Sequence, residues 1–312
     1  MTTLAPAGVA APRAARRPPS PMRRRQNAAA YTFITPFVVV FLAMIVVPLV
    51  YAAYVSVFRT QLVGGTMFVG LGNYSRALTD PLFLSGVARM ALFLVVQVPI
   101  MLGLALVFAL LLDAGVLFLQ RFVRLGIFVP YAVPSVVAAL MWGYLYGPDF
   151  GPFAQLAHNL NLPPPAFLSA SWMLGSIMNV VTWEYIGYNM IVMYAALRAI
   201  PSELYDAAAV DGAGRFRTAW HVKIPAIRPA ILLTAIFSVI GSFQLFNEPN
   251  IMRTLSPNVI GTAYTPNLYA YNLAFVNRET NYAAAIAFLL GLVIMVVSYV
   301  VQLSGQRKGD AR

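Results

Sequence analysis

Long apolar segments, separated by shorter polar ones, constrain the fold of this chain more than any other feature. The first, residues 31–58, is much longer than the roughly 7–15-residue apolar region of a signal peptide, so we expect it to remain as an uncleaved span. Hydrophobic residues make up 60% of the chain, against roughly 45–50% in soluble domains. Lipid cannot satisfy exposed backbone N–H and C=O groups, which favours helices. The sequence therefore predicts an all-α polytopic membrane protein with about six transmembrane helices.

The apolar segments also define a domain organisation. Residues 1–30 are predicted to be a disordered basic tail, residues 31–303 the transmembrane domain, and residues 304–312 a short second tail. Pro130 and Pro134 should break the third span, because each removes an N–H from its helix. Residues 59–89 are predicted to be a loop with short amphipathic helices, and residues 248–281 another loop. The predicted spans are residues 31–58, 87–112, 122–146, 172–197, 229–247 and 282–303.

Basic residues are distributed unevenly between the two sides of these spans. Of 21 Lys and Arg residues, 16 lie on the side of the termini and of residues 201–229. The other five are Arg59, Arg76, Arg89, Arg253 and Arg278. Positive residues accumulate on the cytoplasmic side, which predicts a multi-pass protein of the cell membrane with both termini in the cytoplasm. This distribution also explains the net charge of +11 without a nucleic-acid partner.

The segment from residue 201 to residue 229, termed the coupling loop below, is polar and basic and lies between the fourth and fifth spans. Pro201 suits the first turn of a helix over residues 201–210. Asp211 and Gly212 then predict a turn, because glycine accepts positive φ. A second short helix over residues 214–222 should end before Pro225. The residue chemistry alone is equally compatible with an ordinary cytoplasmic loop.

The spacing within this loop resembles a known motif. Asp206-Ala207-Ala208, three residues, Gly212, nine residues and then residues 222–225 resemble the EAA loop of binding-protein-dependent ABC importer permeases, with Asp206 in place of the usual Glu. In that family the loop forms a coupling helix that docks on a cytoplasmic ATPase subunit. The resemblance assigns this role to Leu204, Asp206, Ala207, Ala208, Asp211, Gly212, Phe216 and Pro225.

Three other phrases resemble the carbohydrate-uptake subfamily related to the maltose permeases. They are FVGLGNY at residues 68–74, PYAVPSVVAALMW at residues 130–142, and LYAYNLAF at residues 268–275, together with residues 281–285 before the last span. The resemblance implies a sugar substrate and a membrane complex of a bacterial cell. Its other members would be a second, similar permease, two ATPase subunits and an extracytoplasmic substrate-binding protein.

No catalytic or cofactor-binding residue is predicted in this chain. It lacks the G-x-x-x-x-G-K-[ST] phosphate-binding pattern, so ATP and Mg²⁺ are assigned to the partner ATPase subunits. It contains no cysteine, and neither His158 nor His221 has a ligand partner at suitable spacing, so we assign no metal. We therefore expect a transport subunit and not an enzyme.

Acidic residues inside spans are costly and are usually functional or paired. Glu184 lies near the middle of the fourth span, and Glu248 follows the fifth. They could line a water-filled cavity that binds substrate hydroxyls. Alternatively, Glu184 bonds a neighbouring helix and Glu248 lies in interfacial water, or one of them carries the proton of a proton-coupled secondary transporter. The predicted substrate-pathway residues are Trp183, Glu184, Tyr188, Asn189, Gln244, Asn247 and Glu248.

Overall fold

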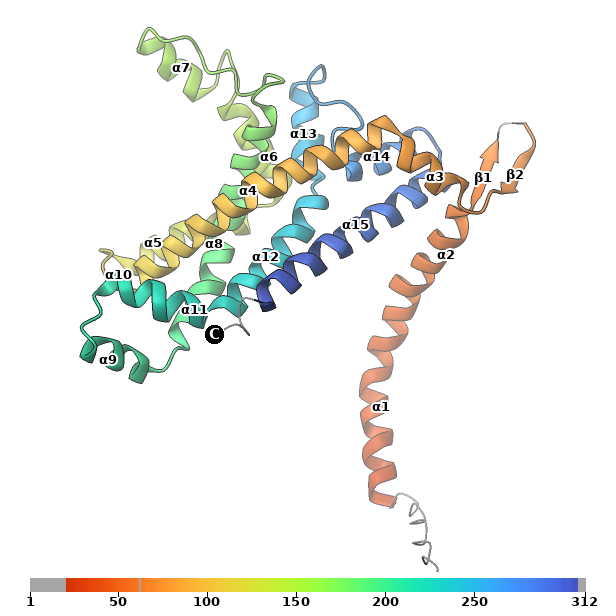
Figure 1. Ribbon diagram of the computed structural model, residues 1–312. Helices are drawn as coiled ribbons and strands as arrows, with labels where there is room; N and C mark the ends of the chain where they lie inside the picture. The colour runs from red at the N-terminus through yellow and green to blue at the C-terminus, as the bar shows by residue number, and fades with distance from the viewer. Residues whose placement is uncertain (1–20, 62, 308–312) are drawn as a thin grey trace, which may run out of the picture. The chain divides into compact units, whose positions relative to one another are not determined.

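The computed structural model describes residues 21–61 and 63–307, and the side chains of residues 30–61 and 63–305 (Figure 1). It divides into two units, Met1–Ala52 and Ala53–Arg312, which we describe separately. The predicted tail at residues 1–20 and the last five residues lie outside the described residues. Residues 21–30 and 304–307, assigned to the two tails from the sequence, belong to helices.

The first unit is helical over its described residues. Helix α1 (Pro21–Phe41) leads through a π-helical turn (Leu42–Val46) into α2 (Val47–Ser56), whose last residues belong to the second unit. The wide turn closes with the Val47 N–H on the Leu42 oxygen. It lies directly before Pro48, whose ring would otherwise clash with the carbonyl four residues earlier. The apolar stretch Ala30–Ser56 has 27 residues, about 40 Å of helix, which is enough to cross a bilayer.

The second unit begins with a β-hairpin that the sequence analysis missed. Strands β1 (Phe58–Gln61) and β2 (Gly65–Phe68) pair antiparallel, with Thr60 opposite Thr66. Gly64 and Gly65 both have positive φ at the turn. Helix α3 (Gly72–Thr79) follows, so the prediction of short helices after the first span is confirmed for this segment, and the hairpin is the one addition to an otherwise helical fold in the described residues.

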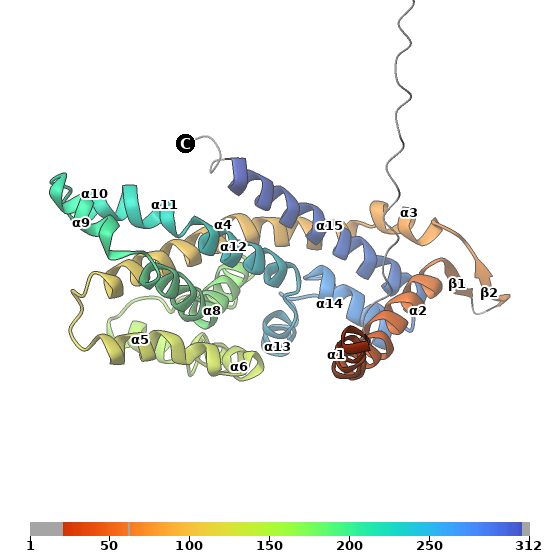
Figure 2. The same ribbon diagram turned by 90° about the horizontal axis from the view of Figure 1, so that it is seen from below.

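The remaining helices form one bundle. Figures 1 and 2 show α12 packed between α4 and α15, while α8 lies along α4. Met90 and Phe93 of α4 are fully buried, as are Met173 and Ile177 of α8. The helices are α4 (Pro81–Asp113), α5 (Gln120–Phe128), α6 (Ser135–Leu145), α7 (Pro152–Asn159), α8 (Met173–Arg198), α9 (Ser202–Val210), α10 (Arg215–Thr218), α11 (Ile224–Ala226), α12 (Arg228–Phe243), α13 (Asn247–Leu255), α14 (Pro266–Tyr271) and α15 (Thr280–Arg307). Three short non-α turns join them: Val129–Ala132, Ala219–Lys223 and Asn272–Val276.

Helix length and composition agree with a polytopic membrane protein. Within the described residues, Ala30–Ser56, Pro81–Asp113 and Thr280–Gly305 are long and apolar enough to cross a membrane. Two bent pairs bring the number to as many as five: Gln120–Ala132 with Ser135–Leu145, bent by 103°, and Arg215–Ala226 with Arg228–Phe243, bent by 65°. The bend at Pro134 is the predicted break in the third span. Helix α8 is 26 residues long but too polar to meet the same criterion, so six spans remain a prediction.

Several predicted boundaries are wrong, each for a local reason. Helix α4 begins at Pro81 and not near residue 87, because Asp80 caps it by accepting from the Leu82 and Phe83 N–H groups. By contrast, the helix predicted over residues 201–210 is present as α9, with Pro201 at its N-cap. The helix after Gly214 continues through Pro225, because a π-helical turn directly before the proline closes on the Ala219 oxygen. The predicted 248–281 loop contains α13 and α14.

Candidate functional site

A cavity of about 370 Å³ lies inside the bundle, where the fifth predicted span is interrupted. Helix α12 ends at Phe243, and α13 starts at Asn247 after three non-helical residues. Backbone carbonyl groups that lose their helical N–H donors at this break accept hydrogen bonds from side chains instead. Asn267 Nδ2 donates to the Gln244 oxygen at 3.0 Å, and Thr265 Oγ1 donates to the Leu245 oxygen at 3.1 Å. Such a break is tolerated at membrane depth where it is buried in protein or lines a cavity.

Five of the seven predicted pathway residues line this cavity: Tyr188, Asn189, Gln244, Asn247 and Glu248. They come from α8, from the break and from the first turn of α13. The amides are held in place by neighbours: Asn247 Nδ2 donates to Ser135 Oγ at 2.7 Å, and Asn189 Nδ2 donates to the Tyr185 oxygen at 3.0 Å. The cavity is therefore lined by oriented polar groups on two facing helices.

Trp183 and Glu184 do not line the cavity. Trp183 packs edge to face against Trp142, with ring centroids 5.8 Å apart, and belongs to the apolar core. Glu184 lies behind the wall, with its side chain next to that of Glu248. Trp183, predicted to be a pathway residue, thus lies outside this cavity, because the α8 surface turns it towards α6.

The two carboxyl groups are both removed from water. Glu184 is 3% exposed and Glu248 is 5% exposed, and Glu184 Oε2 has no hydrogen-bond partner among the described residues. The alternative in which Glu248 lies in interfacial water is therefore wrong, and Glu184 does contact a neighbouring helix.

Two further residues line the cavity: Tyr131, which sequence reasoning missed, and Gln97, which it had assigned a role at the kink of Pro99. Tyr131, in the turn that joins α5 to α6, stacks on Tyr188 with centroids 4.9 Å apart and meets Tyr185 edge to face at 5.9 Å. Gln97 of α4 also lines the cavity and donates to Thr182 Oγ1 at 3.3 Å. Tyr131 was present in the phrase at residues 130–142, but only the fold places it opposite α8.

Gly187 permits close packing between two parts of the cavity wall, α8 and α5. A Cβ atom at this position would overlap the backbone of Ile127 and Phe128 in α5. Only glycine permits this close approach, which positions the turn carrying Tyr131 against the α8 segment carrying Tyr185 and Tyr188. The spacing of aromatic groups in the cavity therefore depends on one residue without a side chain.

The coupling loop folds as a capped helix followed by a second helix. Gly212 has φ +70°, and its N–H donates to the Ala209 oxygen while the Ala213 N–H donates to the Ala208 oxygen. This pair of bonds is a Schellman motif, which ends α9 and satisfies two of its last carbonyls. Among the eight predicted coupling residues, only Ala208 is buried and Pro225 is half-buried; Leu204, Asp206, Ala207, Asp211, Gly212 and Phe216 are exposed.

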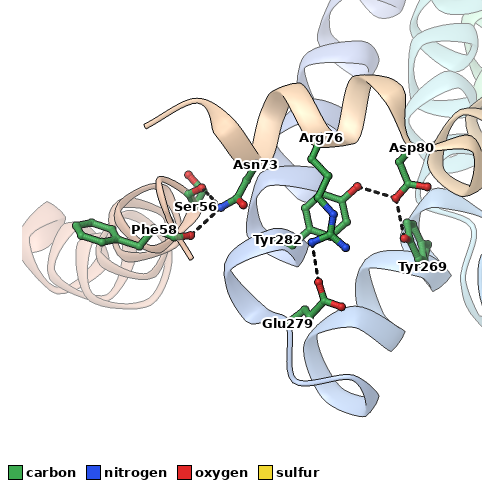
Figure 3. Close-up of polar contacts among 8 residues, drawn as sticks. All are labelled: Ser56, Phe58, Asn73, Arg76, Asp80, Tyr269, Glu279 and Tyr282. Atoms are coloured by element: carbon green, nitrogen blue, oxygen red, sulfur yellow. Dashed lines mark hydrogen bonds and ion pairs between the residues drawn. The ribbon is translucent and has the colours of Figure 1, made fainter. Parts of the chain in front are cut away.

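A polar network ties together the opposite end of the bundle (Figure 3). Asp80 Oδ2 accepts from the Tyr269 hydroxyl at 2.8 Å and from the Tyr282 hydroxyl at 2.6 Å. Arg76 lies 3.8 Å from the centre of the Tyr282 ring and pairs with Glu279 at 2.8 Å. Burial alone would raise the pKa of Asp80, but the bonds from Tyr282 and Tyr269 and from two backbone N–H groups outweigh it and lower that pKa below its ordinary value.

The same network joins three segments that are far apart in the sequence, residues 68–74, 268–275 and 281–285. Asn73, from residues 68–74, is buried and donates to the backbone oxygens of Ser56 and Phe58 at 2.8 and 2.7 Å. Tyr269 comes from residues 268–275 and Tyr282 from residues 281–285. These phrases are therefore structural at one end of the bundle and do not line the cavity.

Comparison with known proteins gives a consistent result over most of the chain. Residues 105–309 match the family described as "Binding-protein-dependent transport system inner membrane component". The arabinooligosaccharides transport system permease protein AraP of Bacillus subtilis is 29% identical over 293 residues, 91% of both chains. The lactose transport system permease protein LacF of Rhizobium radiobacter is 30% identical over 285 residues, 90% of this chain and 95% of that protein. A chain of the bacterial alginate ABC transporter has the same fold, with a TM-score of 0.79 at 17% identity over 91% of this chain and 96% of that one.

Proposed function

Because this chain belongs to the family of binding-protein-dependent transport system inner membrane components, we propose that its cavity is the route by which a sugar or sugar-like solute crosses the membrane. The observation that carries the proposal is the break between α12 and α13, which places Gln244, Asn247 and Glu248 in one cavity with the rings of Tyr131 and Tyr188. Sugar hydroxyls can bond the amides and Glu248, while apolar ring faces can stack on Tyr131 and Tyr188. Relatives named for arabinooligosaccharides and lactose support this substrate class.

The proposed machine contains three further kinds of component besides this chain and its solute. A second, similar permease would complete the route, two cytoplasmic ATPase subunits would bind ATP and Mg²⁺, and an extracytoplasmic binding protein would deliver the solute. The absence of a phosphate-binding loop in this sequence supports the assignment of ATP to separate subunits. Gentle purification of the tagged chain, with mass spectrometry of its partners, tests this composition; recovery of the chain alone in folded form would contradict it.

The coupling loop is proposed to dock on an ATPase subunit through α9. Its exposed Leu204 and Phe216 side chains lie on a segment rich in charge, which gives it both apolar and polar contact groups. The chain has no cysteine, so an Ala207→Cys variant has a unique thiol for cross-linking. We expect cross-links from this position to the ATPase subunit, and none from Leu156→Cys, an exposed position on α7 near the other end of the bundle (Figure 1).

Both termini are proposed to lie in the cytoplasm. Helix α15 ends at the same end of the bundle as α9–α11 (Figure 1), which agrees with the distribution of basic residues. Val63 and Phe118 are 89% and 87% exposed and are assigned to opposite sides. In intact cells, an impermeant maleimide should label Val63→Cys and not Phe118→Cys. Labelling of Phe118→Cys alone would reverse the topology.

Transport itself is tested with the purified complex in proteoliposomes. Replacing Tyr188 with Ala removes a ring that lines the cavity, and we expect ATP-driven uptake to fall by roughly 2- to 10-fold, the range of an aromatic contact. Tyr144→Ala is the matched control, because Tyr144 lies exposed on α6 outside the cavity lining. Equal uptake by both variants and the unmodified complex would contradict the assignment of the route.

A further inference from the structure

A buried ion pair connects the coupling loop to the cytoplasmic end of α4. Lys223 Nζ donates to Asp113 Oδ2 at 2.6 Å, and the side chains are only 14% and 7% exposed. Asp113 is the last residue of α4, and Lys223 is the last residue of the π-helical turn in the coupling loop. The other ion pair among the described residues, Arg76–Glu279, is 44% and 42% exposed. The two segments joined by the buried pair are 110 residues apart in the sequence.

Helix α9 reaches the same ion pair through Tyr205. Lys223 Nζ lies 5.2 Å from the centre of the Tyr205 ring, within the range of a cation–π contact. The Tyr205 hydroxyl is buried without a hydrogen-bond partner among the described residues. Burial raises the pKa of Tyr205, as does the negative charge of Asp113, while Arg198 acts in the opposite direction. Asp113, Lys223 and Tyr205 therefore form one cluster from three elements.

Helix α4 connects this ion pair to the wall of the cavity. Gln97, which lines the cavity, lies on the same helix as Asp113, which continues through Pro99, 16 residues earlier, or about 24 Å at 1.5 Å per residue. Helix α4 also packs along α8, which carries Tyr188 and Asn189. A displacement of Asp113 along the helix axis would therefore reach both walls of the cavity.

The buried pair is better suited to setting position than to adding stability. Removing two charges from water costs about as much as their attraction returns, so such pairs contribute little net stability, although loss of one partner leaves an unpaired buried charge. A contact of 2.6 Å also fixes the two segments in one arrangement. The pair therefore sets the position of α4, α9 and the π-helical turn at their junction.

We propose that Asp113, Lys223 and Tyr205 form a latch that transmits movement of the coupling loop to α4 and so to the cavity. The proposal rests on the proposed docking of α9 on an ATPase subunit. Asp113 and Lys223 are positioning residues: they contact neither the solute nor ATP, and they hold α4 in register with α9. Without the ion pair, ATP hydrolysis would continue while movement of α4 becomes decoupled from it.

The test measures ATP hydrolysis and uptake together. It uses proteoliposomes that contain the whole complex and its binding protein, with a saturating concentration of the solute that is identified by copurification. Asp113→Asn and Lys223→Met should raise the ATP hydrolysed per solute imported by about tenfold, within the usual range of coupling energies. The double variant Asp113→Lys with Lys223→Asp restores opposite charges and should return the ratio towards that of the unmodified complex. Arg121→Met removes an exposed cation on the same side of the bundle and should leave the ratio unchanged.

Other outcomes would overturn the latch. An unchanged ratio in assembled Asp113→Asn and Lys223→Met complexes would show that the ion pair does not transmit movement. If the single variants fail to assemble, whether or not the double variant restores assembly, the ion pair serves folding or assembly, and this outcome overturns the latch. Failure of the docking proposal itself is distinguishable, because Ala207→Cys would then not cross-link to the ATPase subunit in the unmodified complex.

Discussion

Glu184 and Glu248 are 64 residues apart in the sequence, yet their side chains are neighbours: Glu248 of α13 lines the cavity, and Glu184 of α8 lies behind it. This contact joins the two halves of the wall across the break in the fifth predicted span. Because both side chains are buried, each is part of the other's polar environment. The pair therefore links the arrangement of α13 to that of α8.

Glu248→Ala should destabilise the protein, because it leaves the Glu184 carboxyl group buried without its neighbour. The expected loss is about 1–3 kcal/mol, the cost of an unsatisfied buried polar group. Glu248→Gln keeps the shape and supplies an N–H donor to Glu184, so its thermal unfolding midpoint in detergent should remain near that of the unmodified chain. Equal midpoints for the Ala and Gln variants would contradict this role.

Gly187→Ala should distort the cavity, because the added methyl group overlaps the backbone of Ile127 and Phe128. Overpacking typically costs about 1–3 kcal/mol, so both the unfolding midpoint and uptake should fall. Gly175→Ala is a matched control on the same helix, where a Cβ meets no atom within 4 Å. That substitution should be neutral or stabilising by roughly 0.5–1 kcal/mol, since alanine favours helix. A comparable loss at both positions would contradict the close-packing argument.

Gly212→Pro should abolish uptake while the protein remains in the membrane. Proline cannot adopt φ +70°, and it removes the N–H that bonds the Ala209 oxygen. The α9 C-terminus would then lose its Schellman motif and its orientation. Asn tolerates this backbone conformation, so Gly212→Asn should retain most uptake. Normal uptake by the Pro variant, with expression confirmed by immunoblot, would count against a coupling role for this turn.

Asp80 should make one end of the bundle sensitive to acid. Its pKa is lowered in the folded chain, so its stabilising contribution is complete above the ordinary carboxyl pKa of 3.8 and disappears as pH falls through the lowered value. Asp80→Asn removes this ionisation. The unfolding midpoints of the unmodified and Asn variants should differ at pH 5 and converge below pH 3.8. A difference that stays constant over this range would exclude Asp80 as its source.

The sequence predicts much of the bundle because apolar runs and prolines act locally. Helix α8 (Met173–Arg198) matches the predicted residues 172–197, and Pro134 lies at the predicted break. Asp80 and Pro81 were an available signal for the early start of α4, since Asp favours the cap and Pro the first turn. Gly64 and Gly65 likewise favour a hairpin turn. Both signals lie in the long polar segment at residues 59–89, which was interpreted as a loop with short helices.

Other features depend on contacts between distant segments. Glu248 is buried because α13 folds back against α8 and α6, which no local pattern indicates. The phrases containing Asn73, Tyr269 and Tyr282 predicted a family, but only the fold shows that they form one network away from the cavity. The helix continues past Pro225 because a π-helical turn absorbs the missing N–H, and the sequence offers no local rule for such a turn.

The most direct test of the account asks whether the cavity changes sides during the ATP cycle. Ser238→Cys places the unique thiol in the cavity lining, and an impermeant maleimide reports which face of the membrane reaches it. In the assembled complex, we predict labelling from the cytoplasmic side without nucleotide, and from the external side after trapping with ATP, vanadate and the binding protein. Val63→Cys, the control, should be labelled from outside in both states. Labelling of Ser238→Cys from the same side in both states would contradict the proposal that this cavity is the translocation route.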